Sequence, residues 1–248
     1  MTTIRLRALL ASTALAAFLA TGAIAQDIEA EIVPLGELDY EGLYTEGMSV
    51  EDLLDAAVTG PTGDDIGEVE NVLFDQDGRV LSIIAEVGGF LEMGDTHVNV
   101  PWDRVEILES GEELMIPLTQ DRIEDYTLLT DDYVTATDAS SDLEEVGGDN
   151  AGVVGTGPQV WRATDLIGDT ARLREGDGYV GYGYVDDLIL RDGMIAAVVA
   201  NPDAGLGLRG PYAYPYRTFE PGLGTYDLPY GRADIEGLEP FDDDRLDG

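Results

Sequence analysis

The chain has 248 residues, with 51 acidic residues against 13 basic ones, and a formal net charge of −38. Every basic residue is Arg, Cys is absent and only one His is present, which excludes disulfides, thiolate nucleophiles, sulfur-ligated zinc or iron–sulfur sites and lysine Schiff bases. The acidity argues against a nucleic-acid partner, because binding a polyanion requires clustered positive charge.

Residues 1–25 have the pattern of a secretory signal peptide. Two Arg residues precede an uncharged, Ala-rich stretch, which ends in the small-x-small sequence Ala23-Ile24-Ala25. We therefore expect cleavage between Ala25 and Gln26 and a periplasmic or secreted mature protein. The alternative is an uncleaved membrane anchor. A membrane span needs ~20 strongly apolar residues, whereas this stretch is short, rich in Ala and interrupted by Ser and Thr. No stable membrane insertion is expected after cleavage.

The first β-rich region lies within residues 49–126. Residues 66–74 form a predicted strand, Asp75–Gly78 a turn, and residues 80–87 the returning strand. Alternation along the returning strand places one set of apolar side chains on the same face. The apolar residues expected in the core are Val69, Leu73, Leu81, Ile83, Ala85 and Val87.

A loop after this strand carries three large apolar side chains, Phe90, Leu91 and Met93. Two interpretations are open for it. The loop is either a docking surface for a protein partner or a plug that folds back over one end of a barrel.

A second β-rich region repeats the first. Residues 67–74 match residues 183–190, and residues 77–84 match residues 192–199. The strand end Val100-Pro101-Trp102 matches Tyr214-Pro215-Tyr216. Two copies at this separation predict two domains rather than a solenoid. The expected organisation is a signal peptide at 1–25, an N-terminal extension at 26–48, a first domain at 49–126, a flexible Gly/Asp/Ser-rich linker at 127–160, a second domain at 161–222 and an acidic C-terminal tail at 223–248.

At these residues the chain resembles the PRC-barrel family. The resemblance rests on Ile66-Gly67-Glu68-Val69, on Asp75-Gln76-Asp77-Gly78, on Val87-Gly88-Gly89 and on Val98-Asn99-Val100-Pro101-Trp102. It implies a small β-barrel with scaffold or adaptor roles and no shared catalytic residues. The second copy has Asn201-Pro202-Asp203 in place of the paired glycines. The predicted fold is therefore mainly β, with two small PRC-barrel-like β-barrels in tandem.

Tyrosines are dense in the second copy, and Tyr212, Tyr214 and Tyr216 share one face of a strand by their spacing. Tyr is favoured at interfaces because it combines a large apolar body with a polar tip. One interpretation is therefore an interaction surface. The other is a Tyr-rich barrel wall or a contact between the domains.

His97 and the acidic turns offer little specific chemistry. A lone His before a strand predicts a partly exposed structural residue rather than a general base. Asp64-Asp65 and Asp75–Gly78 could attract Ca²⁺, but the EF-hand spacing is absent. We expect loosely bound cations, with no specific metal site, cofactor or catalytic residue.

The sequence thus predicts a non-catalytic, exported scaffold protein whose protein partner is unknown. Two alternatives are open. One is an acidic envelope protein that binds divalent cations or assists stress tolerance, and the other is an enzyme that uses carboxylates or Tyr, which a deep pocket with convergent polar groups would favour.

Overall fold

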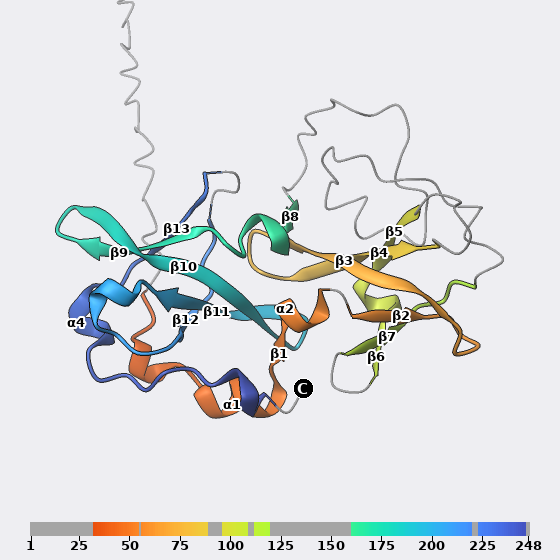
Figure 1. Ribbon diagram of the computed structural model, residues 1–248, viewed down its shortest axis with the longest axis horizontal. Coiled ribbons are helices and arrows are strands. Elements are labelled where there is room, and N and C mark those ends of the chain that lie inside the picture. Colours follow the sequence, from red (N-terminus) through yellow and green to blue (C-terminus); the bar gives the residue numbers. More distant parts are fainter. Residues whose placement is uncertain are drawn as a thin grey trace, which may run out of the picture. The chain divides into compact units, whose positions relative to one another are not determined.

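Figure 1 shows the computed structural model, which describes residues 32–54, 56–88, 96–108, 112–119, 160–219 and 223–246. The predicted signal peptide and all but the last residue of the predicted linker lie outside these residues. Within the described residues, no helix is long and apolar enough to cross a membrane. Residues Val33–Gly248 form one unit by their contacts, and that unit is mainly β.

The first sheet has the strand order β5-β4-β3-β2-β7-β6. Strands β2 to β5 form an antiparallel meander, and β7 then pairs with β2 in parallel. The strands are β2 (Ala57–Thr59), β3 (Asp65–Asp75), β4 (Val80–Val87), β5 (Thr96–Pro101), β6 (Glu106–Leu108) and β7 (Glu113–Met115).

The second sheet has the order β12-β11-β10-β9-β13 and repeats this arrangement. Strands β9 to β12 form the antiparallel meander, and β13 pairs with β9 in parallel. The strands are β9 (Thr170–Glu175), β10 (Gly178–Arg191), β11 (Met194–Pro202), β12 (Tyr212–Pro215) and β13 (Thr225–Leu228). We call β2 to β7 the first repeat and β9 to β13 the second repeat.

The segment that leads into each repeat adds a short strand to the sheet of the other repeat. The strand β1 (Met48–Ser49), which precedes the first repeat, pairs with β10. The strand β8 (Val160–Arg162), which precedes the second repeat, pairs with β3. One edge of each long central strand is therefore divided between a strand of its own repeat and a strand that leads into the other (Figure 1).

The prediction of two closed barrels needs correction. In the described residues neither sheet path returns to its first strand, so the structure shows two open sheets, and the first is a half-barrel. The core gives the physical reason. One cluster of buried side chains includes Val58 and Ile83 of the first repeat together with Val185 and Tyr226 of the second. The two open sheets pack over a shared core instead of each closing into a barrel.

The expected core face of β4 is mostly confirmed, since Ile83, Ala85 and Val87 are buried in the main cluster. Leu81 is different, because it packs with Leu73 and Ile84 in a separate cluster on the other side. A β-bulge in the β3–β4 pairing causes the shift. An extra residue in one strand reverses the faces of the residues beyond it.

The remaining elements are short helices. Of these, α1 (Tyr40–Glu46) contacts β10, α2 (Val50–Leu53) contacts both β10 and β3, and the 3-10 helices η2 (Trp102–Arg104) and η5 (Ala163–Asp165) lie beside the first sheet. The others are α4 (Arg232–Ile235), η1 (Leu35–Glu37), η6 (Ala204–Leu206) and η7 (Asp243–Arg245). Phe241 is 2% exposed and stacks on Tyr44 at 5.0 Å between ring centroids. The segment predicted as an acidic tail therefore contributes β13 and a buried aromatic side chain. The acidic composition of this segment gave no indication that Phe241 is buried, because its burial depends on Tyr44, which is far away in the sequence.

Candidate functional site

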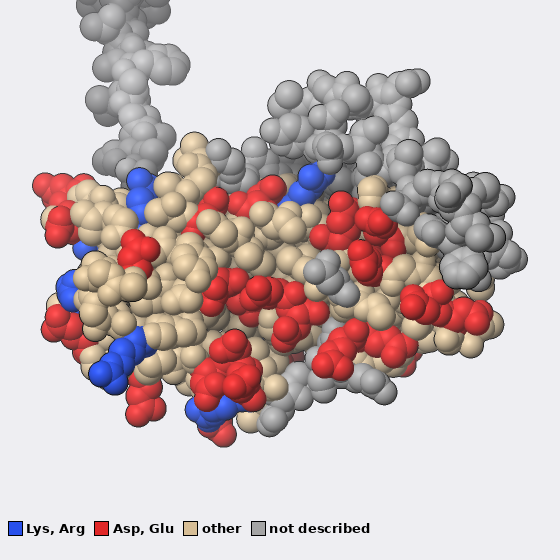
Figure 2. Space-filling view, in the orientation of Figure 1, with Lys and Arg blue, Asp and Glu red and all other residues tan. Residues whose placement is uncertain are grey.

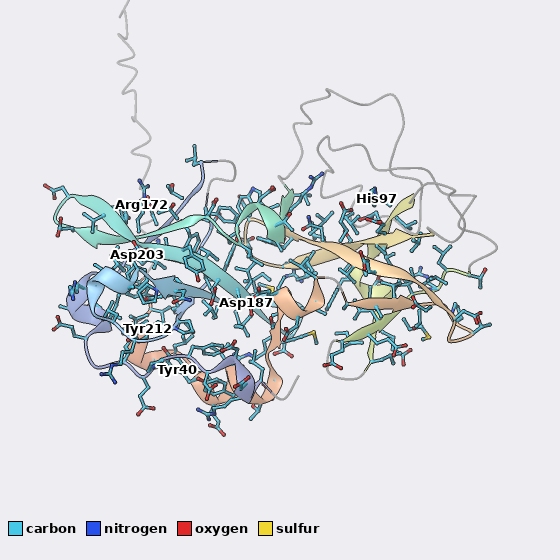
Figure 3. The ribbon with its side chains drawn as sticks, in the orientation of Figure 1. Tyr40, His97, Arg172, Asp187, Asp203 and Tyr212 are labelled. Atoms are coloured by element: carbon cyan, nitrogen blue, oxygen red, sulfur yellow. The ribbon has the colours of Figure 1, made fainter. Side chains whose placement is uncertain are left out.

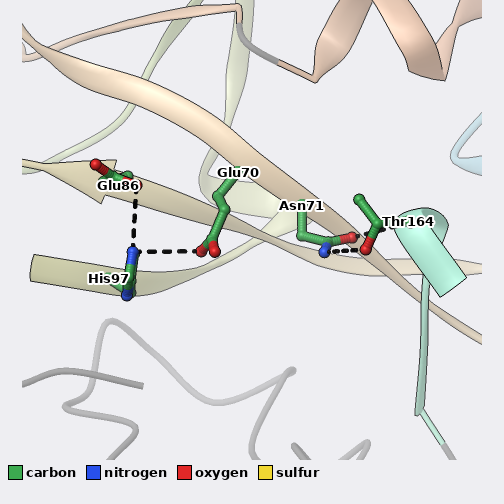
Figure 4. Close-up of polar contacts among 5 residues, drawn as sticks. All are labelled: Glu70, Asn71, Glu86, His97 and Thr164. Carbon is green, nitrogen blue, oxygen red and sulfur yellow. Dashed lines mark hydrogen bonds and ion pairs between the residues drawn. The ribbon is translucent and has the colours of Figure 1, made fainter. Parts of the chain in front are cut away.

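The first junction between the repeats joins β8 and η5 to β3. Phe74 of β3 stands opposite Trp161 of β8 in the antiparallel register. Nearby, Asn71 reaches η5: its Nδ2 donates to Thr164 Oγ1 at 2.7 Å, and its Oδ1 accepts from the backbone N–H of Thr164 at 3.5 Å (Figure 4). Asn71 Oδ1 also accepts from the backbone N–H of Val72 at 3.1 Å. One amide side chain thus satisfies backbone groups of both repeats.

The second junction has the same design with the repeats exchanged. Asp187 occupies the position in β10 that Asn71 occupies in β3. Its Oδ1 accepts from the backbone N–H of Glu51 at the start of α2, at 2.8 Å, and from that of Leu188 at 2.7 Å. The Ser49 hydroxyl donates to the same carboxyl group. Figure 3 shows Asp187 where β10 passes α2.

The turns of the two repeats also meet. The backbone N–H of Val80 donates to the carbonyl oxygen of Gly193 at 2.9 Å, and the N–H of Ile195 donates to that of Gly78 at 2.7 Å. Both glycines have positive φ, 83° at Gly78 and 71° at Gly193, a conformation that L side chains rarely adopt. Each bond is the counterpart of the other with the repeats exchanged, so the repeats are arranged as an approximate two-fold pair.

Two aromatic side chains complete this exchange. An added Cβ at Gly78 would meet the Tyr216 ring at 2.8 Å, and one at Gly193 would meet the Trp102 indole at 3.5 Å. Trp102 and Tyr216 occupy equivalent positions in the two repeats. Each therefore packs on the turn of the other repeat.

The first repeat belongs to a known type of domain. Residues 46–131 match the PRC-barrel domain. This match covers β1 to β7 and ends before the second β-region, from β8 to β13. The resemblance is thus confirmed for the first repeat, and the PRC-barrel assignment of the second repeat stays a prediction. No curated protein sequence matches the chain.

The tyrosines that the sequence placed on one face of β12 do share a face, but that face is internal. Tyr212 and Tyr214 are 4% and 0% exposed, and Tyr216 is partly buried against the main cluster. Ala213 between them is buried on the opposite side of the strand. Since Tyr212 and Tyr214 are buried and Tyr216 is only partly exposed, these tyrosines are wall and junction residues rather than an exposed surface.

These tyrosines also bond to one another inside the second repeat. The Tyr214 hydroxyl donates to the Tyr182 hydroxyl at 2.9 Å, and the two rings meet edge to face. Burial raises the pKa of Tyr182 to about 12 and raises that of Tyr214 as well. Both hydroxyls therefore stay protonated at neutral pH, which suits a structural role.

Two other tyrosines of β10 are exposed. Tyr179 and Tyr184 are each 44% exposed, and Val180 is 40% exposed. The Arg172 guanidinium lies 5.8 Å from the centre of the Tyr179 ring and also pairs with Asp227, with Nε and Oδ1 2.6 Å apart. Figure 3 shows Arg172 on the hairpin of β9 and β10. We call Tyr179, Val180 and Tyr184 the hairpin surface.

The sequence contains a local pattern that indicates part of this surface, although the spacing of the tyrosines does not reveal it. The turn Gly176-Asp177-Gly178 marks the tip of the hairpin. Side chains near a hairpin tip extend beyond the core that the rest of the strand covers. Position along the hairpin therefore separates Tyr179 and Val180 from the buried Tyr182, but it does not account for Tyr184, which lies farther from the tip and is exposed.

The predicted loop residues Phe90, Leu91 and Met93 lie outside the described residues. At the similar place in the second repeat, Leu206 and Leu208 are partly buried and pack against the main cluster. Leu206 and Leu208 thus pack in the way that the plug interpretation expects. For Phe90, Leu91 and Met93 of the first repeat, both interpretations stay predictions.

His97 lies in β5 beside two carboxylates. Its Nε2 is 3.3 Å from Glu86 Oε2 and 3.6 Å from Glu70 Oε2 (Figure 4). The side chain is 24% exposed, so the prediction of a partly exposed strand residue is confirmed. The three residues form a small ion-pair cluster on the PRC-barrel domain whenever the imidazole is protonated.

Acidic side chains spread over the face in Figure 2 and outnumber the basic ones there. Asp75, one of the residues considered for Ca²⁺, uses its Oδ1 to accept from the backbone N–H of Asp77 at 3.0 Å and of Arg79 at 2.9 Å. This carboxylate therefore closes the turn. Among the described residues, no group of three or more acidic or His side chains is arranged to hold a metal ion.

Proposed function

We propose that the chain is an exported, non-catalytic scaffold protein built on two PRC-barrel-like repeats. The reciprocal pairing of β1 with β10 and of β8 with β3 carries the proposal. It supports a single rigid body, because neither sheet can be completed without a strand from beside the other. A rigid body of this kind presents surfaces at fixed positions, which is what a scaffold requires.

The hairpin surface supports a protein partner. Exposed Tyr side chains supply large contact area at low cost in side-chain entropy, and Tyr is enriched among residues that dominate interfaces. Acidic side chains outnumber basic ones over the face in Figure 2, although Arg172 lies against Tyr179 within the hairpin. Opposite charge increases the rate of association and favours correct partners. We therefore infer a partner with an apolar contact site bordered by basic residues.

The test compares capture by three forms of the mature protein from a periplasmic extract. The wild-type protein should capture a specific partner, and the double variant Tyr179→Ser, Tyr184→Ser should lose at least tenfold in affinity for it. Ile107→Ser is the matched control, because Ile107 is 36% exposed and lies in the other repeat. If the double variant and the control bind equally well, the hairpin surface is not the binding site.

Export has its own measurement. Sequencing of the N-terminus of protein isolated from the periplasmic fraction should begin at Gln26. Recovery of the protein from the cytosol with residues 1–25 intact would overturn this part of the proposal.

The acidic surface also favours a second candidate function, divalent-cation binding. Calorimetry with Ca²⁺ separates the two. Saturable binding together with a loss of partner capture would favour the cation-binding protein, whereas weak, salt-sensitive binding supports loosely held cations on a scaffold.

A further inference from the structure

The two junctions differ in one chemical property. Asn71 and Asp187 are equivalent, each is 7% exposed, and each bonds the first residues of a short helix that leads into the other repeat. An amide does not titrate in the physiological range, whereas a carboxyl group does. The approximate two-fold pair thus contains one junction that responds to protons and a matched one that does not.

The surroundings of Asp187 disfavour its charged form. Burial raises the pKa of Asp187 to about 7, although the bonds from Ser49 and from the backbone N–H groups of Glu51 and Leu188 act in the opposite direction. The neighbouring charges are also negative. Glu51 of α2 faces Asp187, and Asp186 of β10 and Asp243 of η7 act on Glu51 in turn.

A neutral Asp187 reproduces the bonding of Asn71. In both side chains one oxygen accepts from backbone N–H groups. Asn71 uses its other group as a donor, to the Thr164 hydroxyl. A protonated carboxyl group likewise has a donor on its second oxygen, and the Ser49 hydroxyl can accept from it. The charged form keeps the acceptor bonds but leaves a buried charge without a positive partner among the groups that act on it.

We propose that the Asp187 junction is a pH-sensitive connection between the repeats, which holds β1 and α2 firmly on β10 in acid and weakens as the pH rises toward neutrality. The direction follows from proton linkage. Since the folded protein retains the proton to higher pH than the unfolded chain, whose Asp has a pKa of 3.8, stability falls as the pH rises from about 4 to about 7. Above that window the cost is complete and no longer changes.

Hydrogen exchange of the full chain between pH 5 and pH 8.5 tests the proposal, with rates corrected for the intrinsic pH dependence of exchange. The protection of residues 48–54 should fall by tenfold or more across this range. The protection of residues 160–165, at the Asn71 junction, should change much less and serves as the internal control. Equal changes at both junctions, or no change at residues 48–54, would overturn the proposal.

Two variants assign the effect to the side chain. Asp187→Asn should make the protection of residues 48–54 independent of pH, as at the Asn71 junction. Asn71→Asp should transfer the pH dependence to residues 160–165. If Asp187→Asn folds and retains the wild-type pH dependence, the acidic neighbours and not Asp187 are responsible, and the proposal is wrong.

Discussion

Trp161 offers the most direct test that the two repeats share one core. It enters from β8 and is 4% exposed, and its ring centroid lies 5.0 Å from that of Phe219 and 6.2 Å from that of Phe74. A buried Trp removes about 200 Å² from water, which at ~25 cal/mol per Å² gives about 5 kcal/mol. We expect Trp161→Ala to lower the free energy of unfolding by about 3–5 kcal/mol, as large-to-small core substitutions do.

Trp161→Phe is the matched control. It keeps an aromatic ring and removes the indole N–H, which is buried without a hydrogen-bond partner in the described part of the chain. We expect this variant to lose about 1 kcal/mol or less, because it deletes an unsatisfied donor together with some packing.

Denaturant unfolding of the full chain provides the measurement, followed by circular dichroism and by fluorescence. The chain has two Trp residues, so either variant leaves Trp102 as the sole indole, and Trp102 packs on the turn of the second repeat at Gly193. Both signals should report one coincident transition. A Trp161→Ala cost below about 1 kcal/mol, or two separate transitions, would refute the shared core.

Three further predictions concern the core, a close backbone contact and the surface charge. Ile83→Asp should abolish cooperative unfolding, because Ile83 is fully buried and an unpaired charge there costs several kcal/mol; an unchanged melting curve would show that its face is misassigned. Gly183→Ala should lower the free energy of unfolding by about 1–3 kcal/mol, since the added Cβ would overlap the Asn201 carbonyl oxygen. Gly181→Ala is the control, because an added Cβ there meets open space, and its free energy of unfolding should change by less than about 0.5 kcal/mol; equal losses for the two variants in denaturant unfolding would contradict this. Added salt should raise the melting temperature, because it screens the self-repulsion of a chain with net charge −38, and calorimetry at low and high salt checks it.

The strands and the repeat could be predicted from the sequence because they depend on local chemistry. The Asp-Gly turns that precede β4 and β11 and the apolar alternation around Ile83 are properties of neighbouring residues. The bulge that moves Leu81 to the other side could not be predicted in this way, since the pairing partner decides where an extra residue is accommodated.

The candidate site shows the same division. Alternation correctly places Tyr212 and Tyr214 on one face of β12, but the main core cluster that covers that face is assembled from both repeats. In the same way, the acidic segment after residue 222 supplies Phe241, whose partner Tyr44 is distant in the sequence.

The amino-acid sequence alone establishes the extreme acidity, the absence of Cys and Lys, and the duplicated pattern of β-strands. Only the tertiary structure decided that β1 and β8 cross between the repeats and that Asn71 and Asp187 fulfil equivalent roles at the two junctions. The physical reason is that strand formation depends on neighbouring side chains, whereas a shared edge and a buried carboxyl group depend on which distant segment excludes the water.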